Sequence, residues 1–324
     1  MYILEMSKLN PGDIFLTGND EKVSRVVRKF TSGSYSHAIL YVGNGSYIHS
    51  DRDGVHANNI QRLLFESDQN VTVLRLKSHT DLTDVCEYAR TQIGKEYSIK
   101  GAVNAKAKLK VPFGNNRQFC SKLVAEAYDF IGIKLSKDTD YCTPKDIEDC
   151  NILQPVSDAI RLATEEEIDL ATSDSPLTKQ TEATNQILNE ARKVSNKDIQ
   201  TLQEVLEYVC QNPESDGAIS KVVRESGYLT LFDREISKNS WRYNYLEFIV
   251  LPLSKEDLTV MVHREMKSSE DLLDRFGRML IMYTQLHENY NLEFTLLHKE
   301  LYSKLVKNAI AHNDTAKKVY ELIT

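Results

Sequence analysis

The sequence predicts an α+β domain with a small antiparallel sheet, followed by an α-helical domain. Short apolar runs separated by turn signals fill residues 10–80, and amphipathic helical spacing takes over from Asp81 in the same half of the chain. Beyond residue 198 the apolar spacing is mainly helical. A chain of 324 residues is long enough for about two domains.

The boundary between the two domains is expected near residue 160. We assign residues 1–160 to the mixed domain and residues 198–324 to the helical domain. Residues 161–197 between them are polar and rich in turn-forming residues, which predicts a linker or a peripheral segment.

Four short segments are expected to form the sheet. Residues 13–16 follow a Pro-Gly turn signal, and residues 71–76 alternate apolar with polar side chains. The apolar run at residues 37–42 is closed by Gly43-Asn44-Gly45, and residues 46–49 continue after that turn. This pair is predicted to be a β-hairpin.

Two amphipathic helices are expected to cover the sheet. The first carries its apolar side chains at Val85, Tyr88, Ala89 and Ile93, and Gly94 is expected to end it. The second begins near Cys120 and is expected to end at Gly132. Its apolar side chains are Leu123, Val124, Ala127, Tyr128 and Ile131.

The second domain is expected to hold several helices. Ser195 with Asp198 resembles a capping box that opens one helix, and Ser269 is expected to cap another. Two further helices are predicted near residues 293–311 and 314–323. Heptads are not sustained, so no long coiled coil is expected.

The composition excludes several classes of protein. Hydrophobic residues make up 41% of the chain and charged residues 27%, which excludes a disordered chain and a collagen. Five cysteines are too few and odd in number for a disulfide framework. No run approaches the roughly 18 apolar residues of a membrane span. Because residues 1–10 lack the pattern of an export signal, we expect a reducing, cytoplasmic setting.

The net charge of -7 is unevenly distributed. Residues 1–155 hold 20 Lys and Arg against 19 Asp and Glu, whereas the remaining residues hold 20 against 28. Phosphate contacts need a surplus of Lys and Arg, so the acidic second half argues against nucleic-acid binding.

The context of Cys120 is the feature that most indicates chemistry. The cysteine lies on the first turn of an amphipathic helix, where the dipole and the backbone N–H groups stabilise an anion. A thiol there has a lowered pKa and is more nucleophilic. It needs a general base, for which His37 at the start of an apolar strand is the candidate. His49, on the paired strand, is placed to orient His37.

Several separated motifs resemble the NlpC-type papain-like cysteine peptidases. Residues 9–15, 37–45 and 48–49 resemble the strand half of that family. Residues 94–97 and 119–124 resemble its nucleophile half. Because His37 precedes Cys120, the order is that of the circularly permuted branch, which includes YiiX/YebB-like hydrolases and lecithin retinol acyltransferase-like enzymes. The resemblance covers roughly residues 8–150.

The resemblance implies a role for each matching residue. Cys120 corresponds to the nucleophile, His37 to the base and His49 to the third polar residue of the triad. Tyr97 matches a tyrosine near the nucleophile, and we place Tyr97 and Gln118 in substrate or oxyanion binding. The usual Asp-Cys-Ser-Gly is replaced here by residues 119–122, Phe-Cys-Ser-Lys, which argues against a cell-wall peptide as substrate.

The other cysteines and histidines are expected to be structural. Cys86, Cys142, Cys150 and Cys210 are interpreted as small buried hydrophobic residues. His56 is the competing candidate for the place of His49. The histidines after residue 260 are interpreted as surface or packing residues. With no CxxC pair and no HExxH motif, we expect no metal site and no cofactor.

Six basic residues gather before and at the start of the nucleophile helix: Lys100, Lys106, Lys108, Lys110, Arg117 and Lys122. Residues 105–111 alternate basic with apolar side chains, which predicts three lysines on one strand face. The face is expected to be a solvated surface. The alternative is a basic rim that attracts an anionic substrate, such as a phospholipid headgroup or an acidic protein.

These observations predict a thiol-dependent hydrolase. It is expected to cleave an amide bond in a peptide, an isopeptide or an acylated amine, through a Cys-His-His triad and a thioester. One alternative is lipid acyl transfer or ester hydrolysis by the same Cys–His pair. A second is a binding module without catalysis. The helical domain is expected to have a regulatory or targeting role, or to bind a second copy or a partner protein.

Overall fold

The computed structural model describes residues 1–18, 34–106 and 117–324. The chain divides into two compact units, Met1–Thr181 and Glu182–Thr324. Among the helices of the described residues, none combines the length and the apolar character needed to cross a membrane.

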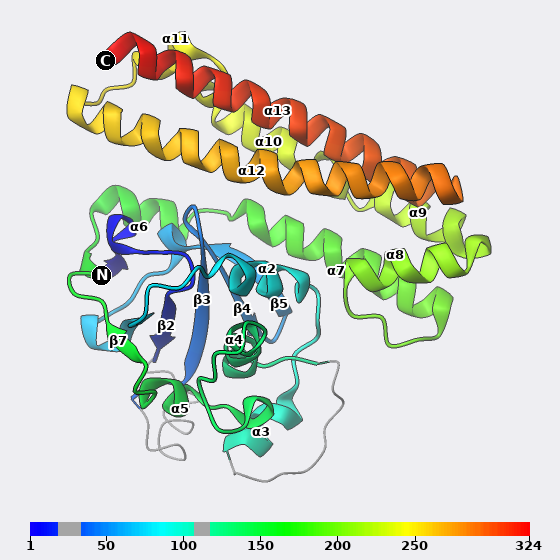
Figure 1. Cartoon of the computed structure of the whole chain (residues 1–324), viewed down its shortest axis with the longest axis horizontal. Helices are drawn as coiled ribbons and strands as arrows, with labels where there is room; N and C mark the ends of the chain where they lie inside the picture. The colour runs from blue at the N-terminus through cyan, green and yellow to red at the C-terminus, as the bar shows by residue number, and fades with distance from the viewer. Residues whose placement is uncertain (19–33, 107–116) are drawn as a thin grey trace. The chain divides into compact units, whose positions relative to one another are not determined.

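The first unit is built on a six-stranded antiparallel sheet in the order β5-β4-β3-β2-β6-β7 (Figure 1). Its strands are β2 (Ile14–Thr17), β3 (His37–Gly43), β4 (Ser46–Asp51), β5 (Gly54–Asn59), β6 (Val71–Leu76) and β7 (Leu153–Pro155). The four segments expected from the sequence are β2, β3, β4 and β6, so the antiparallel sheet is confirmed. A separate pair joins the two ends of the unit, because β1 (Tyr2–Leu4) pairs with β8 (Ile160–Leu162).

The sheet is buried on both faces. One face packs against α2 (Thr83–Thr91) and α4 (Cys120–Asp129), in a core that includes Leu40 and Tyr128. Ile39, the neighbour of Leu40 on β3, faces the other core with side chains from β1. Successive side chains of a strand point to opposite faces, and each fully buried one contributes roughly 1.5–3 kcal/mol. Burial on both sides explains why β3 is a continuous apolar run.

Glycines form the turns that the sequence predicted. Gly43, Asn44 and Gly45 have φ values of 92°, 52° and 73°, as a tight hairpin between β3 and β4 requires. Gly94 follows α2 and Gly132 follows α4, both with positive φ. The two helices and their ends are therefore confirmed.

Shorter elements complete the first unit. They are α3 (Ile99–Lys106), α5 (Pro144–Glu148) and the 3-10 helices η1 (Met6–Lys8), η2 (Ile60–Arg62), η3 (Asp68–Asn70) and η4 (Thr139–Tyr141). The strand expected at residues 105–111 is wrong at its start, because Ala105 and Lys106 end α3. Residues 107–111 lie outside the described residues.

The segment expected to be a linker contains two helices. Thr164 and Glu167 form a capping box that opens α6 (Glu165–Thr172), and Arg161 binds the Glu167 carboxylate at 2.6 Å. The following helix, α7 (Pro176–Ser195), crosses the boundary between the units. It buries Ala183, Ile187, Leu188 and Ala191. Its apolar spacing, rather than its polar composition, determines that this segment is helical.

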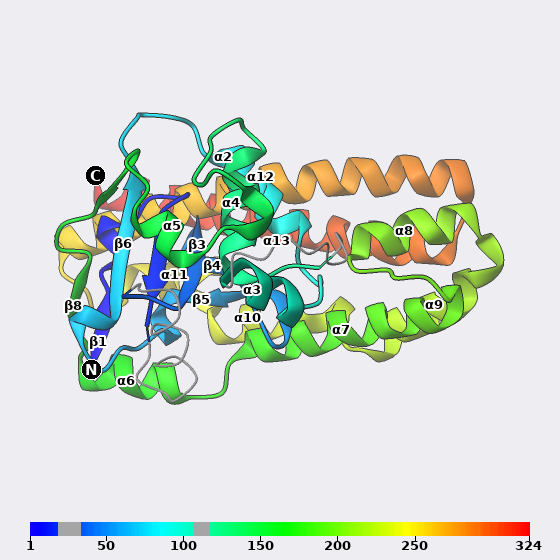
Figure 2. The ribbon, with the colours of Figure 1, turned by 90° about the horizontal axis from the view of Figure 1, so that it is seen from below.

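The second unit consists of helices and short turns. Its elements are α8 (Leu202–Gln211), η5 (Pro213–Ser215), α9 (Asp216–Glu225), η6 (Tyr228–Thr230), α10 (Leu231–Lys238), η7 (Ser240–Tyr243), α11 (Tyr245–Ile249), α12 (Lys255–Tyr290) and α13 (Glu293–Ile323). The longest two, α12 and α13, run side by side (Figures 1 and 2). Asn291, with φ 49°, forms the tight turn between them.

Three expectations for helix boundaries were wrong. Ser195 ends α7 rather than capping α8, whose cap is Thr201 through a bond from the Glu204 N–H. Ser269 lies inside α12 and is fully buried. Residues 293–311 and 314–323 form one helix, because no Gly or Pro interrupts them.

The long helix pair also buries polar side chains. Glu265 on α12 is 2% exposed and accepts hydrogen bonds from Arg242 Nε and His312 Nε2, each at 2.9 Å. Burial alone would raise the pKa of Glu265, but these two partners hold it below its ordinary value. His298 on α13 is 1% exposed and His312 is 3% exposed, so these two histidines are packing residues rather than surface ones.

Candidate active site

Cys120 is the first residue of α4. The residue before it, Phe119, is the N-cap and makes no side-chain capping bond. The positive end of the helix dipole is therefore not offset by a polar cap, and it acts on the thiol. Ser121 donates to the Cys142 carbonyl at 2.8 Å, which holds this first turn against the loop before α5.

Cys120 lies in a small pocket with two other residues that the sequence singled out. The pocket contains about 330 Å³ of empty space, part of it open to solvent. Its lining residues are Ser36, His37, Tyr97, Ala102, Ala105, Phe119, Cys120, Ser121, Thr143 and Pro144. The structure therefore brings three residues to one site: Cys120 from α4, His37 from β3 and Tyr97 from the segment before α3.

His37 is the first residue of β3 and is held by a hydrogen bond across the sheet. Its Nε2 lies 2.9 Å from Nδ1 of His49 on β4. The two rings meet edge to face, with centroids 5.2 Å apart. One ring nitrogen of His37 is thus engaged by His49, and the pair is the one expected from the sequence.

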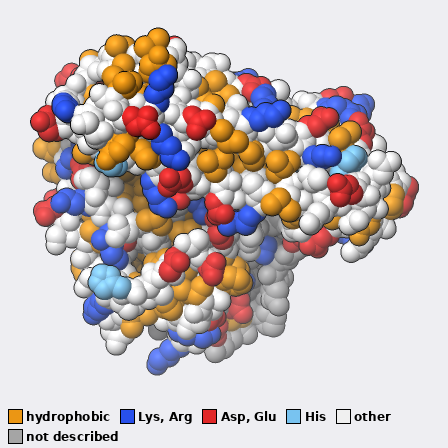
Figure 3. Space-filling view, turned by 45° about the horizontal axis from the view of Figure 1, so that its top comes forward, with side chains coloured by type: hydrophobic (Ala, Val, Ile, Leu, Met, Phe, Trp, Pro, Cys, Tyr) orange, Lys and Arg blue, Asp and Glu red, His pale blue; other side chains and the backbone are white. Residues whose placement is uncertain are grey.

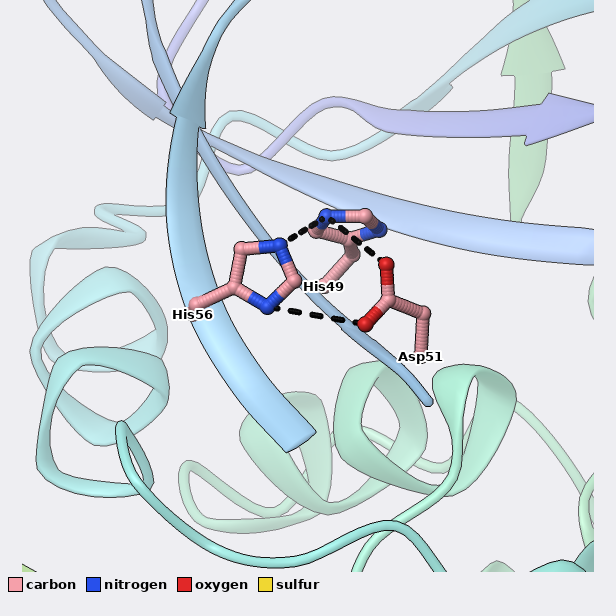
Figure 4. Close-up of side chains that lie close together, drawn as sticks. All are labelled: His49, Asp51 and His56. Atoms are coloured by element: carbon pink, nitrogen blue, oxygen red, sulfur yellow. Dashed lines mark hydrogen bonds and ion pairs between the residues drawn. The ribbon is translucent and has the colours of Figure 1, made fainter. Parts of the chain in front are cut away.

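A third histidine, which the sequence offered only as an alternative to His49, continues this series of hydrogen-bonded rings. His56 on β5 lies directly across from His49 in the antiparallel pairing. Nε2 of His49 lies 3.0 Å from Nε2 of His56, as Figure 4 shows. Nδ1 of His56 lies 3.2 Å from the Gly54 carbonyl oxygen. We call His37, His49 and His56 the histidine chain.

The Gly54 carbonyl selects one tautomer for each ring when all three rings of the histidine chain are neutral. A carbonyl only accepts, so Nδ1 of His56 carries a proton, and Nε2 of a neutral His56 then accepts from His49 Nε2–H. Nδ1 of neutral His49 then accepts from His37 Nε2–H. Neutral His37 is left with its lone pair on Nδ1, the nitrogen that a general base in this pocket would use.

The surroundings keep His49 neutral. Burial, followed by the neighbouring His37 and His56, lowers the pKa of His49 well below its ordinary value. Burial also raises the pKa of Tyr97, and negative charge on Cys120 or Asp51 raises it further. Tyr97 therefore keeps its phenolic proton and can donate a hydrogen bond inside the pocket.

Gln118 does not line the pocket, although it was expected to bind substrate or oxyanion. Its side-chain amide donates to Glu126 Oε2 at 2.5 Å, and the residue is 1% exposed. Its backbone bonds to both neighbours of Tyr97, because Gln118 N–H donates to Glu96 and Gln118 C=O accepts from Ser98. Gln118 therefore holds the Tyr97 segment beside α4.

Within the described residues, the basic side chains near Cys120 do not form a continuous basic rim. Lys122 is 1% exposed, with its Nζ 3.0 Å from Asp140 and 3.5 Å from Glu126. Arg117 pairs with Glu96 at 2.6 Å. Lys108 and Lys110 lie outside the described residues, as do the side chains of Lys100 and Lys106. On the face drawn in Figure 3, acidic and basic side chains are intermixed rather than gathered into one patch.

Of the four cysteines expected to be buried, Cys86 and Cys142 are, whereas Cys150 and Cys210 are only partly buried. Cys86 and Cys142 are buried, and burial raises the pKa of their thiols to about 11 and about 12. Burial also raises the pKa of Cys210. A raised pKa leaves little thiolate near neutral pH, so these thiols are poor nucleophiles.

Comparisons with known proteins match the part of the chain that holds this pocket. Residues 8–148 match the model of a family described as "Permuted papain-like amidase enzyme, YaeF/YiiX". A curated relative, the "Probable lipoprotein peptidase YaeF" of Escherichia coli (strain K12), is 27% identical over 115 residues. That match covers 35% of this chain and 40% of the relative, so it spans less than half of the relative's length.

A solved structure also shows a limited likeness. The crystal structure of "metalloprotein yiiX" from Escherichia coli O157:H7 matches with 15% sequence identity and a TM-score of 0.38. The match covers 46% of this chain and 97% of that one. The likeness to this structure is too weak to indicate a shared fold, and the match to the family rests on the sequence. Residues 8–148 of this chain, less than half of its length, match a circularly permuted papain-like family.

Proposed function

We propose that the first unit catalyses thiol-dependent hydrolysis of an amide bond, with Cys120 as nucleophile and His37 as general base. The observation that carries this proposal is the pocket that Cys120 and His37 both line. The histidine chain adds support, because it leaves the lone pair of His37 on Nδ1. The family of residues 8–148 supports the amide bond as the target.

The first half of the reaction forms a thioester. Cys120 Sγ attacks the carbonyl carbon of the amide while its proton passes to His37 Nδ1. The backbone N–H of Cys120, at the positive end of α4, and the Tyr97 hydroxyl donate to the oxyanion. The tetrahedral intermediate collapses, the carbon–nitrogen bond breaks, and the amine leaves with the proton held by His37.

The second half restores the enzyme. His37 takes a proton from water, the hydroxide attacks the thioester carbonyl, and the carbon–sulfur bond breaks. The acid is released and Cys120 recovers its proton. His49 remains a positioning residue throughout, because its Nδ1 accepts from His37 Nε2–H and stabilises the imidazolium that forms after each proton transfer.

The proposal is tested by offering the full chain three substrates: a peptide amide, a fatty acyl amide and a phospholipid ester. Amide turnover by the wild type, reduced about 1,000-fold or more in Cys120→Ala, would support it. Cys210→Ala is the control, because Cys210 lies in the second unit. Ester turnover without amide turnover would favour a lipid esterase instead.

A further inference from the structure

Three side chains that can ligate a metal converge on the hairpin formed by β4 and β5. His49 and Asp51 are two residues apart on β4 and so point to the same face, and His56 lies across from His49. Asp51 carboxylate oxygens lie 3.9 Å from His49 Nε2 and 3.6 Å from His56 Nδ1 (Figure 4). One ligand atom from each residue can be chosen so that all lie within 4.8 Å of one another.

With Nε2 of both histidines as ligand atoms, the His49–Asp51 separation of 3.9 Å and the His49–His56 separation of 3.0 Å lie on either side of the spacing in a tetrahedral zinc site. Ligand atoms about 2.0–2.1 Å from a tetrahedral zinc ion lie roughly 3.4 Å from one another. The two Nε2 atoms, 3.0 Å apart, therefore need to separate by only a few tenths of an ångström. Two imidazoles and one carboxylate form a ligand set that zinc accepts, with a fourth position left for water.

The surroundings of the three side chains also fit a metal site. Zinc-bound histidines usually donate their other ring N–H to a carbonyl or another acceptor. His56 Nδ1 already bonds to the Gly54 carbonyl, and His49 Nδ1 faces His37 Nε2. The His49 and His56 side chains are only 11% and 12% exposed, whereas Asp51 is 39% exposed. An ion can therefore enter from the side of Asp51.

We propose that His49, Asp51 and His56 form a site for a zinc-like divalent cation, and that the bound cation switches off the Cys120–His37 pair. The switch rests on the proposed function, because it requires His37 to act as the base for Cys120. The site itself rests only on the three side chains.

The switch follows from the positions of the protons. A cation on His49 Nε2 displaces the proton from that nitrogen, so neutral His49 must carry its proton on Nδ1. His49 Nδ1–H then donates to His37 Nε2, which becomes an acceptor. The proton of neutral His37 is consequently on Nδ1, the nitrogen that must accept from Cys120. One proton leaves His49 Nε2 for solvent and one enters at His37 Nδ1, so the net charge of the two rings is unchanged.

Metal binding is measured first, on full-length Cys120→Ala freed of metal by a chelator and titrated with Zn²⁺ alone. This background removes the thiol as a competing ligand. We expect one zinc ion per chain, bound about 10-fold or more weakly after Asp51→Asn is added. Asp53→Asn is the matched control, because Asp53 is exposed in the same turn and its hydrogen bond to Asp51 is made by its backbone N–H, which the substitution keeps. Equal affinity in the two Asn variants, or loss of zinc binding in Cys120→Ala itself, would overturn the site.

The switch is then read from the rate at which iodoacetamide alkylates Cys120, which does not depend on any substrate. We expect Zn²⁺, at a concentration just sufficient to fill the wild-type site, to slow alkylation about 10-fold in the wild type and in Asp53→Asn, but by much less in Asp51→Asn. Slowing of equal size in Asp51→Asn would place the ion on the thiol and overturn the switch. An enzyme that binds zinc in this way but hydrolyses no amide would retain the site while refuting the proposed function.

Discussion

Nε2 of His49 lies 3.0 Å from Nε2 of His56, on opposite strands of the β4–β5 hairpin. Two ring nitrogens at this distance share one proton, and the Gly54 carbonyl beyond His56 determines which nitrogen holds it. The hydrogen bond therefore makes the proton position on His37, two rings away, depend on a backbone oxygen of the hairpin turn.

Replacing His56 tests whether the histidine chain works through proton positions. In His56→Ala, His49 can adopt either tautomer, and we expect kcat to fall about 10-fold with KM unchanged. His56→Gln offers a side-chain carbonyl that accepts from His49 Nε2–H, so most of kcat should return. Steady-state kinetics of amide hydrolysis measure both values. Equal losses in the two variants would indicate that His56 serves only to pack the hairpin.

Replacing His49 tests the bond that holds His37 itself. His49→Ala removes the acceptor of His37 Nε2–H, and we expect kcat to fall about 100-fold. In His49→Asn the amide oxygen can accept that proton, so the loss should be about 10-fold or less. Comparing kcat of the two variants on the same amide tests whether His49 orients His37. Asparagine performing no better than alanine would contradict an orienting role for His49.

A buried hydrogen bond between α4 and the turn before β2 is predicted to stabilise the first unit. Tyr128 Oη donates to the Gly12 carbonyl at 2.6 Å, and Tyr128 is fully buried. Tyr128→Phe leaves that carbonyl without its donor, so the free energy of unfolding should fall by about 1–2 kcal/mol. Urea unfolding measures the change. Tyr290→Phe, at a position that is 48% exposed, should change it by less than about 0.5 kcal/mol.

His298 is predicted to make the stability of the second unit depend on pH. Burial lowers the pKa of His298 to about 4, and its Nδ1 donates to the Phe294 carbonyl at 2.8 Å. Within the described residues, its buried Nε2 has no hydrogen-bond partner. Because the unfolded chain binds a proton near pH 6.5 and the folded chain only near pH 4, stability is complete above pH 6.5 and falls as the pH drops.

The expected loss between pH 6.5 and pH 4 is about 2–3 kcal/mol. Denaturant unfolding at several pH values, followed by a signal from the second unit, measures it. His298→Gln does not titrate and should flatten the curve in this window. His263→Gln, at an exposed position on α12, is the control and should keep the wild-type slope. A wild-type slope in His298→Gln would assign the pH dependence to other groups.

The sequence predicted the strand and helix that meet at the pocket because both have strong local signals. Residues 37–42 are continuously apolar and end in a Gly-Asn-Gly turn, and the helix after Cys120 has a clear apolar stripe that ends at Gly132. The sequence offered His56 only as an alternative to His49, since its place beside His49 depends on strand register. The Asp53-Gly54 pair signals a turn centred one residue later than the observed one, in which Asp51 pairs with Gly54.

Other differences arise where tertiary contacts override local signals. Serine is a common N-cap, but Ser269 lies within α12, which begins at Lys255. The helix continues through Ser269 because the buried side chains of α12 pack against α13. Lys122 is basic, which predicts exposure, yet its pairing with Glu126 and Asp140 lets the first turn of α4 bury it. Glu126 lies four residues after Lys122 on the same helix and follows from spacing, but Asp140 could not be identified in that way, since it comes from the distant η4.

The most direct test of the central claim is intact-mass labelling by a thiol-reactive acyl probe. We expect the wild type to be acylated once, at Cys120. We expect Cys120→Ala not to be labelled and His37→Ala to be labelled about 100-fold more slowly. Labelling of Cys120→Ala at the wild-type rate would contradict the claim that Cys120, activated by His37, is the nucleophile.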